Sequence, residues 1–158
     1  MKPLAAVLLL VSAGACAGGP VLPSEWRDPT VAEMSNEPVK LAISGDFDGN
    51  GKVDGAVIVV SKDGKKEGLL AFMYFSEQEK WFLLDQAPMA KTIFMGLEKY
   101  SPGTYPVLCE TQAECDRGYK KPLTLKNDTI VYYRPESASS LFVWDAKKAT
   151  FTRVWESD

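Results

Sequence analysis

The chain has 158 residues, of which 46% are hydrophobic and 25% charged, a composition typical of one ordinary globular domain. Its 18 Lys and Arg residues against 21 Asp and Glu residues give a formal net charge of −3, so nucleic-acid binding is not expected. The absence of histidine excludes Ser–His and Cys–His nucleophile pairs and His-ligated zinc, whereas chemistry by carboxylates, lysine or tyrosine remains open.

The first residues predict a secretory signal peptide over residues 1–17. A positive start at Lys2 is followed by the apolar run Leu4–Val11 and then by small residues up to Gly19. The apolar run is too short for a transmembrane helix, which needs roughly 20 apolar residues. We therefore expect an extracytoplasmic protein, in the bacterial periplasm or at the outer membrane.

The end of this leader has two interpretations. Ala13-Gly14-Ala15 directly before Cys16 resembles a bacterial lipobox, which implies that Cys16 becomes the lipidated first residue of a membrane-anchored lipoprotein. Alternatively, Ala15-Cys16-Ala17 is an A-x-A site for ordinary signal peptidase, and the product is a soluble secreted protein. Cysteine parity favours the lipoprotein, because Cys109 and Cys115 can form a structural disulfide in an oxidising compartment and leave Cys16 over.

A short helix is expected where the mature domain begins. Residues 18–27 predict a flexible tether, and residues 28–158 a single β-rich domain. Asp28 followed by Pro29 is typical of a helix N-cap with proline at the first helical position, so a short helix over Pro29–Ser35 is predicted.

The first half of the domain predicts four strands in an antiparallel meander. The run Ala-Val-Ile-Val-Val within Gly55–Ser61 is suited to a strand buried on both faces. The Asp63-Gly64 pair between two apolar runs predicts a hairpin turn. The expected strands are Val39–Ser44, Gly55–Ser61, Gly68–Phe75 and Trp81–Asp85.

The second half predicts further short strands, separated by turns such as Asn127-Asp128. With the first half they give about eight or nine strands in an all-β antiparallel sandwich or a strongly curled meander. The expected segments are Thr92–Met95, Tyr105–Cys109, Leu123–Lys126, Thr129–Arg134, Ser140–Asp145 and Phe151–Glu156.

The segment Asp46–Asp54 has the spacing of a Ca²⁺-binding loop. Ca²⁺ takes six to eight oxygen ligands at about 2.3–2.6 Å, and alternate residues of a tight loop point inward. Gly51 at loop position six permits the sharp turn around the ion. Oxygen side chains occupy loop positions one, three, five and nine, which are Asp46, Asp48, Asn50 and Asp54.

Electrostatics also favour a bound ion in this loop over a solvated Asp-Gly turn. Two carboxylates about 5 Å apart repel by on the order of 3 kcal/mol at an effective dielectric constant near 20. Three such groups within nine residues therefore predict a divalent counter-ion. The loop is not an EF-hand, because position twelve is Val57 and both flanking segments predict strands.

Gly45–Val57 resembles the FG-GAP (VCBS-type) repeat, a strand–calcium loop–strand unit of integrin-like β-propellers. The resemblance implies that Asp46, Asp48, Asn50 and Asp54 bind Ca²⁺ through side chains. It also implies that Lys52 binds through its carbonyl, with its side chain directed to solvent. The motif occurs once and covers about a fifth of the mature chain, so it supports the site and not a propeller fold.

The C-terminal part, residues 135–158, is similar to small exported bacterial proteins of unknown function.

Three functional hypotheses remain open from the sequence. The first is a non-enzymatic envelope domain, monomeric and stabilised by structural Ca²⁺, that serves binding of an unknown protein or envelope component, or envelope structure. The second is a protein inhibitor of a hydrolase such as a lysozyme or a protease, because small disulfide-bearing envelope lipoproteins occupy that niche. The third is a metal-dependent hydrolase that uses carboxylates and therefore needs a concave pocket with an open metal position.

Overall fold

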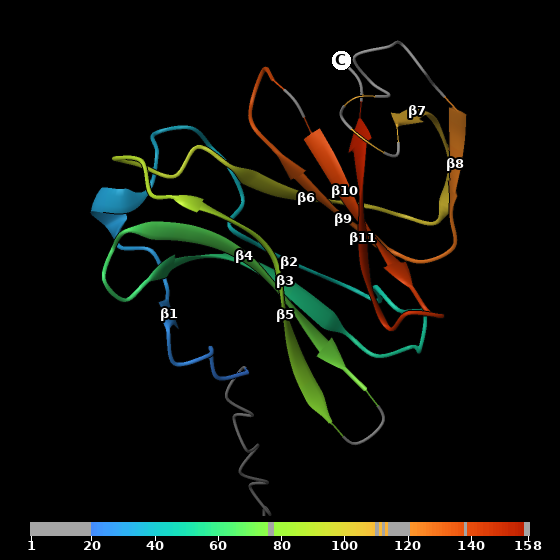
Figure 1. Ribbon diagram of the computed structural model, residues 1–158, viewed down its shortest axis with the longest axis horizontal. Helices are drawn as coiled ribbons and strands as arrows, with labels where there is room; N and C mark the ends of the chain where they lie inside the picture. Colours follow the sequence, from blue (N-terminus) through green and yellow to red (C-terminus); the bar gives the residue numbers. More distant parts are fainter. Residues whose placement is uncertain are drawn as a thin grey trace, which may run out of the picture.

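The protein is an all-β molecule, as the sequence predicts. The computed structural model describes residues 20–75, 78–109, 111, 113, 121–137 and 139–156, and in these ranges it contains eleven strands and one short 3₁₀ helix (Figure 1). The strands are β1 (Trp26–Arg27), β2 (Ala42–Gly45), β3 (Asp54–Ser61), β4 (Lys66–Tyr74), β5 (Glu79–Pro88), β6 (Gly96–Tyr100), β7 (Gly103–Cys109), β8 (Lys121–Leu125), β9 (Thr129–Tyr133), β10 (Ser139–Asp145) and β11 (Thr150–Glu156). No helix in the described ranges has the length and apolar character that a membrane crossing requires.

The first sheet contains the predicted meander. Strands β2, β3, β4 and β5 pair in that order and all antiparallel, and the Asp63-Gly64 turn connects β3 to β4. The additional strand β1 lies on the same edge of β3 as β2, because Trp26 pairs with Ser61 while Ala42 pairs with Val57. The expectation of a four-stranded meander is confirmed, with one strand added.

The second sheet has the order β6-β9-β10-β11-β7-β8, which departs from the order of the strands along the chain. The turn at Asn127-Asp128 joins β8 to β9, but these two strands do not pair with each other. The predicted strand Thr92–Met95 is wrong, because the regular strand β6 begins only at Gly96. Ile93 is nevertheless fully buried, and its backbone N–H donates to the carbonyl of Glu33 at 2.8 Å. The apolar side chain of Ile93 therefore anchors a loop that packs on the main core, and does not mark a strand.

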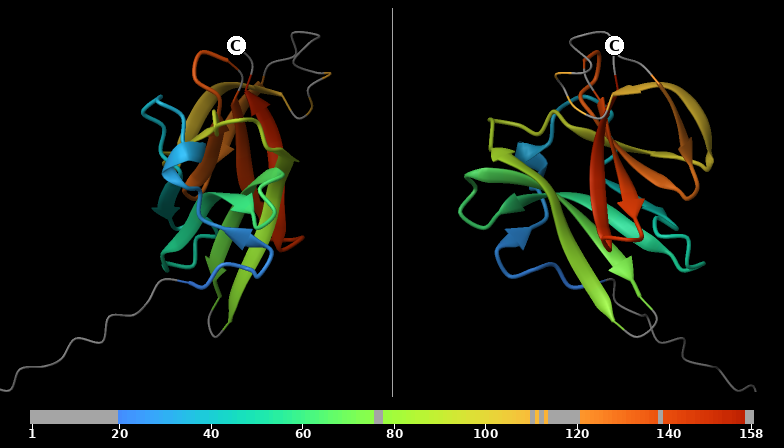
Figure 2. Two further views of the ribbon diagram at one scale, coloured as in Figure 1. Left: turned by 90° about the vertical axis from the view of Figure 1, so that its left-hand side faces the viewer. Right: turned by 45° about the vertical axis from the view of Figure 1, so that its right-hand side comes forward.

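The two sheets pack face to face around one main core (Figure 2). Alternate residues of β3 and β4 point inward, including Ile58 and Leu69, which are 2% and 0% exposed. From the second sheet, Leu97, Ile130 and Phe142 fill the same core. Burial of apolar surface on both inner faces is the main stabilising contribution expected for such a sandwich.

A smaller second core lies on the other face of the second sheet. Val131, Leu141 and Val154 from β9, β10 and β11 are buried there, and Leu123 of β8 packs against them. Because β8 belongs to the same sheet, the β7–β8 hairpin folds back over the outer face of the sheet. The architecture therefore combines both predicted forms, a sandwich whose second sheet is strongly curled.

The segment expected to be a free tether is attached to the first sheet in its described part. Trp26 is buried with Val59 and Leu70 on the outer face, and Leu22 packs against them. The indole N–H of Trp81 donates to the carbonyl of Val21 at 3.1 Å. The bulky Trp26 side chain needs an apolar surface, and the outer face of the first sheet provides it.

The predicted N-terminal helix is reduced to the 3₁₀ helix η1 (Val31–Glu33). Its N-cap is Thr30 and not Asp28, because the Glu33 carboxylate accepts hydrogen bonds from the Thr30 N–H and hydroxyl group. Arg27 of β1 donates two hydrogen bonds to the same carboxylate, at 2.7 and 2.8 Å. These hydrogen bonds, led by that from Arg27, lower the pKa of Glu33 to about 2.

Candidate metal site

The predicted loop connects β2 to β3 and is closed at its base by the backbone pairing of Gly45 with Asp54. Phe47 fixes the loop to the protein, because its side chain is only 1% exposed and belongs to the main core. This buried side chain holds the first carboxylates of the loop close to the start of β3. The loop therefore has a defined position relative to both sheets.

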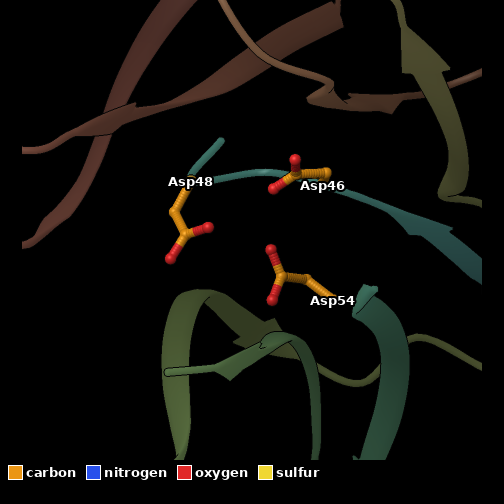
Figure 3. A group of neighbouring side chains, drawn as sticks. All are labelled: Asp46, Asp48 and Asp54. Carbon is orange, nitrogen blue, oxygen red and sulfur yellow. The ribbon is translucent and has the colours of Figure 1, made fainter. Parts of the chain in front are cut away.

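Three of the predicted ligands lie together. One carboxylate oxygen from each of Asp46, Asp48 and Asp54 falls within 4.8 Å of the others. Figure 3 shows the three carboxyl groups facing a shared space between the loop and the start of β3. Such a set of hard oxygen donors is the kind that Ca²⁺ prefers.

Asp46 organises the backbone of the loop. Its Oδ1 accepts hydrogen bonds from the N–H groups of Gly49 at 2.8 Å and Asn50 at 3.0 Å, and its Oδ2 accepts one from Gly51 at 2.9 Å. Each carboxylate oxygen has about two lone pairs, so Oδ2 keeps one for a cation. The carboxylate can therefore hold the turn and bind an ion at the same time.

Asp54 is the buried member of the cluster, with 2% of its surface exposed. Its two oxygens accept hydrogen bonds from the N–H groups of Phe47 and Tyr74, both at 2.9 Å. Burial raises the pKa of the Asp54 carboxyl above its usual value, the two N–H donors oppose that effect, and the charge of Asp48 adds to it. A cation in the shared space would favour the ionised form.

No described lysine or arginine forms an ion pair with any of these three carboxylates. The amine of Lys52, a residue of the same loop, donates to the carbonyl of Phe75 at 3.3 Å. Within the described part of the chain, the negative charge of the cluster is therefore not balanced by a direct side-chain partner.

The other two predicted ligands, Asn50 and Lys52, make contacts to the end of β4, and their roles as ligands stay predictions. Asn50 directs its amide nitrogen to Asp48 Oδ2 and to the carbonyl of Tyr74, both at 2.9 Å, while its Oδ1 accepts the Lys52 N–H at 2.7 Å. The Lys52 side chain lies over the Tyr74 ring, 5.3 Å from its centroid, instead of pointing to solvent. Both residues thus connect the loop to the end of β4.

Glycine is required at two points where the loop approaches its neighbours. Gly49 has φ of +78°, and a Cβ atom there would lie 2.6 Å from Oδ1 of Asn127. A Cβ atom at Gly45 would lie 2.8 Å from Oδ2 of Asp128. The loop can therefore contact the β8–β9 turn only because these two positions lack side chains.

Asn127 and Asp128 are site residues that the sequence identified only as a turn. Asp128 Oδ2 accepts hydrogen bonds from the Asp46 N–H at 3.2 Å and from the Lys99 amine at 2.9 Å. The amide of Asn127 donates to the carbonyl of Phe47 at 3.3 Å. The second sheet thereby holds the loop from the side opposite to β4, a contact without any signal in the local sequence.

The remaining predicted sites fall largely outside the described residues. Cys16 and Cys115 lie there, and of Cys109 the structure describes the backbone, which pairs with Trp155 in the second sheet.

No protein-family model matches the chain, and comparisons with curated proteins and with solved structures give no match either. The resemblance to the FG-GAP repeat therefore remains an inference from the loop residues alone.

Proposed function

We propose that the chain is an exported, lipid-anchored, non-enzymatic envelope protein whose β-sandwich is stabilised by one Ca²⁺ ion in the Asp46–Asp54 loop. The convergence of the Asp46, Asp48 and Asp54 carboxylates within 4.8 Å of one another carries this proposal. The donor set fits a hard divalent cation, because every donor is a carboxylate oxygen with a lone pair left for the ion.

The position of the loop favours a structural role for the ion. Asp54 bonds to the Tyr74 N–H at the end of β4, and Asp46 bonds through its N–H to Asp128 beside β9. An ion that holds Asp46 to Asp54 would therefore connect segments of both sheets. Ions in extracellular modules bind with a Kd of about 10⁻⁴–10⁻³ M. At 10 mM Ca²⁺ that affinity stabilises the folded state by about 1.4–2.7 kcal/mol.

Calcium is expected to raise the melting temperature by about 4–10 °C at 10 mM, relative to the protein in excess EDTA. The variant Asp48→Ala should lose this dependence, because Asp48 is partly exposed and supplies a ligand without filling the core. Differential scanning calorimetry in both conditions measures the effect.

Asp28→Ala is the matched control, since Asp28 is exposed and far from the loop in sequence. It removes the same charge and should keep the full calcium dependence. A melting temperature that is the same in calcium and EDTA for the wild-type protein would show that the loop does not bind Ca²⁺ in this range.

The lipid anchor is tested on protein purified from membranes of an expressing bacterium. The lipobox resemblance at Ala13–Cys16 predicts a mature N-terminus at a diacylated or triacylated Cys16. Intact-protein mass spectrometry should therefore show the mass of residues 16–158 plus the acyl groups. A mature form that starts at an unmodified Gly18 would refute the anchor. If the anchor is present, Cys16→Ser should move the protein from the membrane fraction to the soluble fraction.

A further inference from the structure

A cleft of about 870 Å³ lies beside the calcium loop, on the outer side of the second sheet. Its walls come from β8 on one side and from the β10–β11 hairpin on the other, and Phe47, Asp48 and Asn127 border it at the loop. This volume lies in the range of about 300–1,000 Å³ that is typical of small-molecule sites.

The inner walls of the cleft are apolar. Leu123 of β8, Val143 of β10 and Val154 of β11 line it, and the same three residues belong to the second core. The cleft is therefore continuous with the second core. Apolar walls of this kind favour a ring or a hydrocarbon chain.

Apart from Asp48 of the loop, the charged residues that line the cleft without an ion pair to a described residue are positive. Lys126 and Lys147 line it and are exposed, and neither side chain forms an ion pair or hydrogen bond with another described residue. The other charged groups on the β10–β11 side are neutralised locally, since Asp145 pairs with Lys148 at 3.3 Å and Arg153 pairs with Asp85 at 3.1 Å.

We propose that this cleft binds a small amphipathic anion, an apolar ring or chain that carries a carboxylate. The apolar part would lie between Leu123, Val143 and Val154, and the carboxylate would reach Lys126 or Lys147. Neither feature alone selects this class. An apolar wall without cations would favour a neutral ligand, and lysines on an open surface would give only weak, salt-sensitive attraction.

The calcium loop should regulate this binding, a part of the inference that rests on the proposed function. Asp48 lies at the cleft, so the three carboxylates of the loop place negative charge near the bound anion. A Ca²⁺ ion would neutralise most of that charge and strengthen anion binding. By thermodynamic linkage, the anion must increase calcium affinity by the same factor.

Isothermal titration calorimetry with 2-naphthoate tests the cleft, first in EDTA. The double variant Lys126→Gln/Lys147→Gln should weaken binding about tenfold, whereas Lys62→Gln/Lys91→Gln, which changes the net charge equally away from the cleft, should leave it unchanged. The neutral analogue 2-naphthamide should bind the wild-type protein and the Lys126→Gln/Lys147→Gln variant with the same affinity. Thr152→Trp, at an exposed position that lines the cleft opposite Val143, should abolish binding of both compounds while the melting temperature stays within a few degrees.

The proposal is overturned if 2-naphthoate does not bind at millimolar concentration, if Thr152→Trp binds it normally, or if both lysine double variants lose the same affinity. The linkage to calcium is tested in a second set of titrations. An increase of about threefold in 2-naphthoate affinity at 5 mM Ca²⁺, absent in Asp48→Ala, supports the linkage. If calcium raises the melting temperature but leaves 2-naphthoate affinity unchanged, the linkage is wrong. If calcium has no thermal effect, the proposed function fails while the EDTA titrations still decide on the cleft.

Discussion

Replacing Phe47 with alanine is expected to lower the free energy of unfolding by about 3–5 kcal/mol, the usual cost of removing a fully buried aromatic side chain. Phe47 is 1% exposed, so its removal leaves a cavity in the main core. The same change should weaken calcium binding, because the backbone of Phe47 donates to Asp54 and accepts from Asn127. Urea unfolding in EDTA gives the first effect, and calcium titration by calorimetry gives the second.

Phe142→Ala separates loss of core packing from loss of the loop. Phe142 is 3% exposed and lies in the same core. It belongs to β10, where its backbone pairs with Arg153 and Ile130 and not with the Asp46–Asp54 loop. It should lower stability by a similar amount and keep the calcium affinity of the wild-type protein. Equal calcium affinity in Phe47→Ala and Phe142→Ala would contradict the anchoring role of Phe47.

The second large effect is expected at Asp54. Asp54→Ala leaves the buried N–H group of Phe47 and the partly buried N–H group of Tyr74 without acceptors and should cost about 2–4 kcal/mol. Because this loss comes from hydrogen bonds within the protein, it should be present in EDTA as well as in calcium. The variant also lacks one of the three proposed ligands, so its unfolding curves in calcium and in EDTA should coincide.

Asp48→Ala provides the contrast for Asp54→Ala. In EDTA it should cost much less, since among the described residues the carboxylate oxygens of Asp48 accept hydrogen bonds only from Asn50 of the same loop. An Asp54→Ala variant that is as stable as the wild-type protein in EDTA would show that the buried carboxylate serves only the ion. An Asp54→Ala variant that still responds to calcium would exclude Asp54 as a ligand.

The sequence could predict the strands and the carboxylates because both depend on local patterns. The run of β-branched residues in β3 and the Asp63-Gly64 turn specify a hairpin over a few residues. The spacing of Asp46, Asp48 and Asp54 likewise places three oxygens in one tight loop. In each case the determining residues are close together along the chain.

What the sequence did not predict depends on how the two sheets pack. Strand β1 forms because Trp26 covers the outer face of the first sheet, a surface that exists only after β3 and β4 pair. The sequence identified Asn127-Asp128 only as a turn between two strands, and the order of the strands in the second sheet brings this turn to the loop. No periodicity within a segment reports such contacts between distant segments.

The contact between Asp46 and Asp128 has a consequence for the order in which the protein folds. The two residues are 82 positions apart, and Phe47 and Asn127 are 80 apart, so closing this contact requires a long loop of chain to be ordered first. During synthesis, the first sheet can assemble while the acidic loop still lacks one of its walls. The ion affinity that we propose for the loop would then be complete only after the β8–β9 turn has docked, so that metal loading would be a late event and a reporter of completed folding.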